Sequence, residues 1–149
     1  MARPTRVDPR GMRVAAAITT VVLALVLVTP PPVSIALLVA QTAVFAIGAL
    51  VSLTASPYAV AFARLVRPRI GPPAELEDAR PPRFAQAVGL GFAVVALIGF
   101  AVGAPALGYV AVGFALVAAL LNASVGLCLG CEMYLAWHRI RPAKLTTQA

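Results

Sequence analysis

The sequence has few charged residues and very few acidic ones. Only 11% of its 149 residues are charged, with five Asp and Glu against twelve Lys and Arg, whereas 61% are apolar. A soluble globular domain is about half apolar and about a quarter charged. A domain of this size cannot hide so much apolar surface from water, so lipid is the expected solvent. The basic excess then serves membrane orientation and contact with anionic lipid, and we expect no nucleic-acid partner.

Two of the connecting segments have no charge at all, and this absence predicts the topology. Lys and Arg lie only before residue 14, from residue 64 to 83, and after residue 138, and the turns 29–32 and 103–105 have none. Short basic loops stay on the cytoplasmic side of a membrane. Alternating charged and uncharged connections therefore predict four spans, with both termini and a loop at 67–83 in the cytoplasm.

The apolar runs predict an all-α integral membrane fold in a single domain over residues 1–149. A span needs about 20 apolar residues, and we expect four of them, at about 12–28, 33–55, 84–102 and 107–129. The second and fourth runs are too long for one crossing. Each is expected to continue as a short interfacial helix, after breaks at Ser56-Pro57, which is a helix-start pattern, and at Gly130.

The two halves of the sequence are alike in outline. Pro9-Arg10 and Pro82-Arg83, 73 residues apart, each open a span. Each half is expected to form a helical hairpin of the same orientation, which gives two parallel hairpins. Duplication explains this likeness, and so does the common demand of lipid on any membrane hairpin. The loop 67–83 has five prolines and no helical or strand period, so it is expected to be a polar connector.

Cysteine is also scarce, and the only two lie together in Cys128-Leu129-Gly130-Cys131. Two sulfurs at this spacing can form a disulfide, accept a sulfane sulfur or donate two metal ligands. A purely structural disulfide is not expected at a cytoplasmic edge, because that compartment is reducing. We therefore take Cys128 and Cys131 as candidate catalytic residues. The alternative is that both are small apolar fillers.

Glu132, directly after the pair, is the only acid in any apolar run. Ionisable groups within a membrane usually have a task, so Glu132 is a third candidate catalytic residue, able to take a thiol proton or pair with an arginine. The alternative is that it faces water. Cys128, Cys131 and His138 give three ligands where structural zinc needs four. No metal and no cofactor is therefore expected.

Arginines that open the first and third spans are expected at the same membrane face as the cysteines. Guanidinium groups bind oxyanions and favour a nearby thiolate, so these arginines are candidate anion-binding residues, namely Arg10, Arg13 and Arg83. The alternative is that they only orient the chain. The sequence predicts one pocket that combines both groups, lined by Ser56, Cys128, Cys131, Arg10 and Arg83. When no lipid phosphate is available, Arg83 is expected to pair with Glu132 or with a ligand.

Four short motifs carry a resemblance to a known family. They are Asp8-Pro9-Arg10, Ser56-Pro57, the Pro-Pro-Arg-Phe-Ala-Gln of residues 81–86, and the Cys-Leu-Gly-Cys-Glu-x-Tyr of residues 128–134. Over nearly its whole length the chain resembles an uncharacterised family of small bacterial integral membrane proteins, common in actinobacteria. The resemblance implies a bacterial inner-membrane location and supplies no activity. An association of such genes with thioredoxin-like and sulfurtransferase genes favours thiol or sulfur chemistry.

Three hypotheses of function are open from the sequence. In the first, the cysteines exchange electrons or sulfane sulfur with a cytosolic thioredoxin-like or rhodanese-like partner. In the second, the chain is a transporter, or a transporter subunit, for a small sulfur-containing anion, which four spans would achieve only as a homo-oligomer. In the third, it is a non-catalytic subunit of a membrane assembly.

Overall fold

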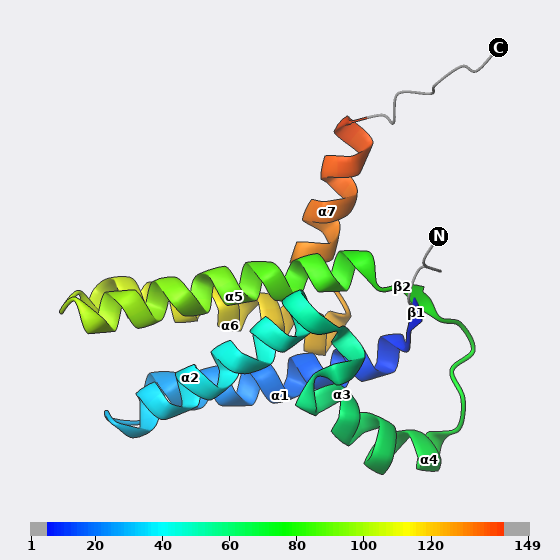
Figure 1. The fold of residues 1–149 in the computed structure, drawn as a ribbon, viewed down its shortest axis with the longest axis horizontal. Helices are drawn as coiled ribbons and strands as arrows, with labels where there is room; N and C mark the ends of the chain where they lie inside the picture. The colour runs from blue at the N-terminus through cyan, green and yellow to red at the C-terminus, as the bar shows by residue number, and fades with distance from the viewer. Residues whose placement is uncertain (1–5, 142–149) are drawn as a thin grey trace.

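The computed structural model describes residues 6–141 and shows four long helices packed side by side (Figure 1). These are α1 (Pro9–Val28), α2 (Val33–Ala46), α5 (Arg80–Ala101) and α6 (Pro105–Val125), and a π-helical turn extends α2 to Val51. With that extension, all four are long and apolar enough to cross a membrane. The predicted all-α membrane fold is confirmed.

The long helices form a bundle in which α1 and α5 each pack against both α2 and α6. Its core combines larger side chains from α1 and α2 with alanines and one valine from α5 and α6, namely Leu23, Val26, Leu38, Phe45, Ala93, Ala96, Ala111, Val112 and Ala115. Small residues bring α5 and α6 close together. A Cβ on Gly99 would lie 2.8 Å from the backbone nitrogen of Gly108. Such close approach stabilises helix pairs in lipid, where packing drives association.

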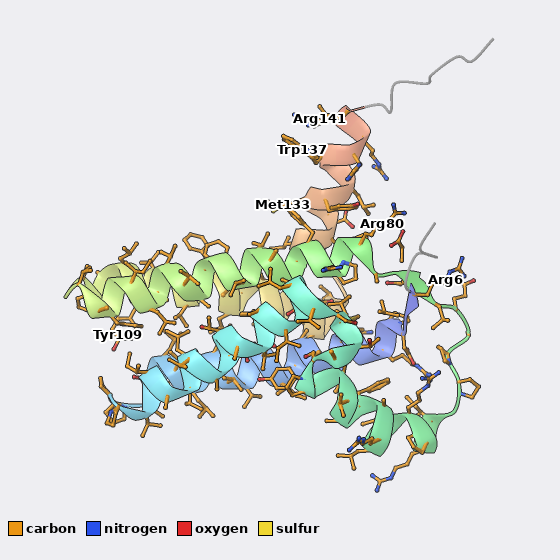
Figure 2. The ribbon with its side chains drawn as sticks, viewed as in Figure 1. Arg6, Arg80, Tyr109, Met133, Trp137 and Arg141 are labelled. Carbon is orange, nitrogen blue, oxygen red and sulfur yellow. A yellow bond between two sulfur atoms is a disulfide. The ribbon has the colours of Figure 1, made fainter. Side chains whose placement is uncertain are left out.

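The outside of the bundle is apolar, and its two ends differ. Large apolar side chains such as Val21, Val39, Val94 and Phe114 are exposed along the long helices. Figure 2 shows many side chains projecting outward from these helices. We call the end with the turns 29–32 and 102–104 the proline end. The opposite end, where α1 and α5 begin and α2 and α6 finish, we call the arginine end (at the right in Figure 1).

The second apolar run breaks at Ser52, four residues before the predicted position. Ser52 has an extended backbone, and its hydroxyl accepts a hydrogen bond from the amide of Thr54. This bond satisfies an amide that the break exposes, as an N-cap residue does. A 3-10 turn (Leu53–Ala55) follows, and then α3 (Pro57–Ala61), which a π-helical turn (Phe62–Val66) connects to α4 (Arg67–Ile70).

The Ser56-Pro57 pattern does start a helix. Pro57 occupies the first turn of α3 and Ser56 is the N-cap residue. The side chain of Ser56 makes no capping hydrogen bond, however. The pattern therefore identified the start of α3 and missed the break that precedes it.

The fourth apolar run ends at Gly126, and not at Gly130 as predicted. Gly126 adopts the left-handed conformation (φ 73°, ψ 13°), which glycine takes without steric cost. The amides of residues 126 and 127 donate to the carbonyls of residues 122 and 121, which closes the helix end. After this turn α7 (Leu129–Ile140) leaves the bundle at a steep angle (Figure 1), with Gly130 in its first turn.

The segment 67–83 is not the connector without secondary structure that its composition predicts. Its first residues form α4, and α5 begins at Arg80. Between them β2 (Glu77–Asp78) pairs antiparallel with β1 (Arg6–Val7), so that Val7 lies opposite Glu77. Two-residue strands are too short to show an alternating pattern, so neither strand could be predicted from the sequence.

Contacts at the arginine end repeat in the two halves of the chain. The strand before α1 pairs with the strand before α5. Asp8 accepts hydrogen bonds from the backbone and side chain of Arg10, and Asp78 accepts the same bonds from Arg80. In addition, α3 packs on α1 and α7 packs on α5. This repetition favours duplication, with an offset of 70 residues between the two Asp–Arg pairs, so that Arg10 corresponds to Arg80 and not to Arg83.

Candidate thiol site

The two cysteines lie together at the start of α7. Cys128 is the N-cap residue, with extended backbone, and its sulfur accepts a hydrogen bond of 3.3 Å from the amide of Cys131. The two Cα atoms are 5.2 Å apart and a disulfide joins the sulfurs. The turn at Gly126 allows this arrangement. It ends α6 at Val125, so that Cys128 is able to cap the next helix.

The first turns of α7 dock on α5. A Cβ on Gly130 would lie 2.6 Å from the Cα of Ala85, so the two helices touch there. One turn further along, the ring of Tyr134 contacts that of Phe84, with centroids 5.8 Å apart. The residues 84–85 of the Pro-Pro-Arg-Phe-Ala-Gln motif thus hold the cysteine-bearing helix, and both cysteines are partly buried beside it.

The remainder of α7 is amphipathic. Met133 and Trp137, four residues apart, project from the same side of the helix, above the long helices (Figure 2). The guanidinium of Arg141 lies 4.6 Å from the centre of the Trp137 ring. A tryptophan beside basic residues is typical of a membrane–water interface. The short helix expected after the fourth span is thus present, and its position at the interface stays a prediction.

Glu132 lies in the first turn of α7 with its side chain exposed. Ion pairs within residues 6–141 join Arg10 to Asp8 and Arg80 to Asp78, and none involves Glu132. Arg83 therefore does not pair with Glu132, and a ligand as the partner of Arg83 stays a prediction. A carboxylate in the first turn is stabilised by the positive end of the helix dipole, which accounts for its position.

Two of the predicted anion-binding arginines cap helix ends. Arg83 donates to the carbonyls of residues 49 and 50, at 2.7 and 3.3 Å, where the extension of α2 ends. Arg13 donates to the carbonyls of residues 123 and 124, at 3.3 and 3.1 Å, where α6 ends. Each guanidinium thus satisfies carbonyls that a helix end leaves without partners. Each also joins one hairpin to the other.

Arg10, the third of these arginines, pairs with Asp8. Its Nε and Nη2 atoms lie 3.2 and 3.1 Å from the two carboxylate oxygens, and Nη2 also donates to the carbonyl of Gly71 at 2.9 Å. The side chain of Asp8 is only 10% exposed. The hydrogen bonds from Arg10 lower the pKa of Asp8 below its usual value.

This pair predicts a loss of stability in acid. The folded-state pKa of Asp8 is below the unfolded value of 3.8, so the stabilisation is complete above that value and is lost as the pH falls through the folded-state pKa. Between about pH 5 and about pH 2, the thermal midpoint should fall further in the natural protein than in Asp8→Asn. Thermal unfolding in detergent across this range measures it, and equal pH dependence in both proteins would contradict it.

A cavity of about 230 Å³ lies at the arginine end, between the start of α1 and the segment 53–63. Of the five residues predicted to line one pocket, Ser56 lines this cavity and the cysteines, Arg10 and Arg83 do not. The reason is the packing of the short helices. Because α3 packs on α1 while α7 packs on α5, the two break points lie beside different helices.

A polar contact inside the bundle was not predicted. Gln41 is fully buried in α2, donates to the hydroxyl of Thr19 at 3.4 Å and accepts from the hydroxyl of Tyr58 at 2.7 Å. Gln41 is the only amide side chain in the first two apolar runs, which was the available signal. The contact ties α3 to the span that precedes it.

The fold and this site define a small all-α membrane protein in which a Cys-x-x-Cys pair begins a helix that leaves a four-helix bundle. The family model described as "Domain of unknown function (DUF4395)" matches residues 7–139. The chain belongs to this family, which confirms the predicted membership of an uncharacterised domain family. No curated protein and no solved structure matches the chain.

Proposed function

We propose that the protein exchanges a dithiol for a disulfide at Cys128 and Cys131, with a cytosolic thioredoxin-like protein as its partner. The observation that supports this is the position of Cys128 at the N-cap of α7, where its sulfur accepts the amide of Cys131. A helix N-terminus stabilises a thiolate through its amide donors and partial positive charge. Cys128 is therefore the proposed nucleophile and Cys131 the resolving thiol.

The exchange balances without another reactant. The thiolate of reduced Cys128 attacks the partner's disulfide, forms a mixed disulfide and releases one partner thiolate. The thiolate of Cys131 then attacks the Cys128 sulfur, breaks the mixed disulfide and releases the second partner thiolate. Two electrons and the two thiol protons pass to the partner, and the protein keeps its own disulfide. The same steps in reverse reduce the protein.

Single cysteine variants test the assignment of the two roles. In full-length reduced protein in nanodiscs, incubated with a thioredoxin whose single remaining active-site cysteine carries a thionitrobenzoate leaving group, Cys131→Ser should accumulate a mixed disulfide because neither protein has a second thiol to resolve it. Cys128→Ser should accumulate about tenfold less, and the double serine variant none. Non-reducing electrophoresis measures the adduct. Equal trapping by both single variants, or by neither, would contradict the proposal. A gain of one sulfur atom on Cys128 with a rhodanese-like donor would assign sulfane-sulfur transfer instead.

The proposal requires the arginine end to face the cytosol, as the basic residues there favour. Ala74→Cys, placed between α4 and β2 in a background without the natural cysteines, should resist an impermeant maleimide in intact cells and react in broken ones. Ala104→Cys, in the turn between α5 and α6, is the matched control and should react in intact cells. The reverse pattern would place the thiols outside. The transporter and assembly hypotheses stay predictions.

A further inference from the structure

We propose that the cavity beside α3 binds an organic anion that combines an oxyanion head group with an apolar body. This cavity is separate from the thiol site. Residue 85 contacts α7 through Gly130, whereas the next residue, Gln86, lines the cavity. The motif that holds the cysteine helix thus also borders a second site.

Ser56 supplies a hydroxyl group to the wall of the cavity. Its residue is only 9% exposed, it lines the cavity, and its hydroxyl makes no hydrogen bond to any group within residues 6–141. The side-chain amide of Gln86, which also lines the cavity, has no hydrogen bond within the same residues. Both groups are able to hydrogen-bond a polar atom of a ligand in the cavity.

Most of the remaining lining is apolar. Met12, Leu53 and Phe62 contribute larger side chains, with Ala15 and Ala59 between them. The volume of about 230 Å³ is below the roughly 300–1,000 Å³ of pockets for drug-sized ligands. The cavity therefore suits a short apolar body, or the first part of a longer chain.

Two arginines, Arg6 and Arg67, complete the lining. Unlike Arg10, Arg13 and Arg83, neither binds a protein oxygen in the described part of the chain. Asp8, the one acid in the lining, is held by Arg10 in a two-point pair. The charge facing the cavity is thus positive, and guanidinium groups bind oxyanions with paired hydrogen bonds. The head group belongs at these arginines and the apolar body inside.

Such a ligand has two sources, a phospholipid of the membrane or a soluble organic anion. Full-length protein in detergent should gain thermal stability with sodium octanoate, with phosphatidylglycerol, or with both, because binding to the folded state raises its midpoint. Octanoate alone would assign the soluble source and phosphatidylglycerol alone the lipid source. Sodium sulfate, which has no apolar body, should bind about tenfold more weakly or less.

The matched variants separate this site from general effects of amphiphiles. Arg6→Gln with Arg67→Gln should weaken binding of the effective probe by about tenfold or more. Arg64→Gln with Arg69→Gln removes the same charge from exposed arginines that do not line the cavity, and should leave binding unchanged. The double cysteine-to-serine variant should also bind normally, which keeps this result independent of dithiol exchange. No stabilisation by any probe, or equal weakening in both arginine variants, would overturn the proposal.

Discussion

Replacing Gly130 by leucine is expected to detach α7 from the bundle and to slow dithiol exchange by about tenfold or more. A Cβ at this position would lie 2.6 Å from the Cα of Ala85. Because that atom is backbone of a long helix, it cannot yield without moving α5. Overpacking costs about 1–3 kcal/mol or more, and about 1.4 kcal/mol corresponds to a factor of ten. The smallest rearrangement that avoids the clash is release of α7.

The sole tryptophan, Trp137, lies on α7, so its fluorescence emission reports the release directly. Exchange with thioredoxin gives the functional readout. Gly91→Leu is the matched control, because a Cβ on Gly91 would meet nothing within 4 Å. It should leave both measurements unchanged. If Gly130→Leu had the same fluorescence emission and the same exchange rate as the unsubstituted protein, the docking contact would not position the cysteines.

Replacing Arg83 by lysine is expected to destabilise the bundle by about 1–3 kcal/mol, although the charge is kept. Hydrogen bonds that involve a charged group contribute about 1.5–3 kcal/mol. Lysine carries a single ammonium and lacks the planar fork that reaches the carbonyls of residues 49 and 50 together. Arg13→Lys should have a similar effect at the end of α6, and the two losses should add because the sites share no partner.

Reversible unfolding in mixed micelles gives the change in free energy, and Arg69→Lys at an exposed position is the control. Labelling of Ala74→Cys should show that orientation is unchanged, since the number of basic residues at that end stays the same. If both lysine variants had the same free energy of unfolding as the unsubstituted protein, Arg13 and Arg83 would serve only to orient the chain.

The spans and the cysteine pair could be predicted because their signals are local. Each span is one apolar run, and Cys128 and Cys131 are brought together by three-residue spacing alone. The positions of the helix breaks were harder to predict, because at each break two residues of the same type lie about one turn apart and either could end or cap the helix. Ser52 and Ser56 are both able to cap a helix, and Gly126 and Gly130 are both able to end one. Contact between Gly130 and Ala85, distant in sequence, decides the second case.

The partners of the arginines could not be predicted for a related reason. Arg13 binds carbonyls 110 and 111 residues away, and Arg83 binds carbonyls 34 and 33 residues away. Every helix end has carbonyls without intrahelical partners, so no residue type shows which helix end an arginine will bind. An arginine at a membrane surface is also expected for orientation alone, and that expectation concealed the structural role.

The two arginine caps give the two hairpins reciprocal contacts, like those between the subunits of a symmetric dimer. Arg13 of the first hairpin completes the last span of the second, and Arg83 of the second completes the last span of the first, so neither hairpin is whole by itself. A half-length ancestor would have needed two copies that exchanged these caps. The two hairpins differ at one equivalent place, the N-cap of the α-helix that follows each second span. There one copy carries Ser56, which faces a cavity, and the other carries Cys128, which bonds to a second sulfur.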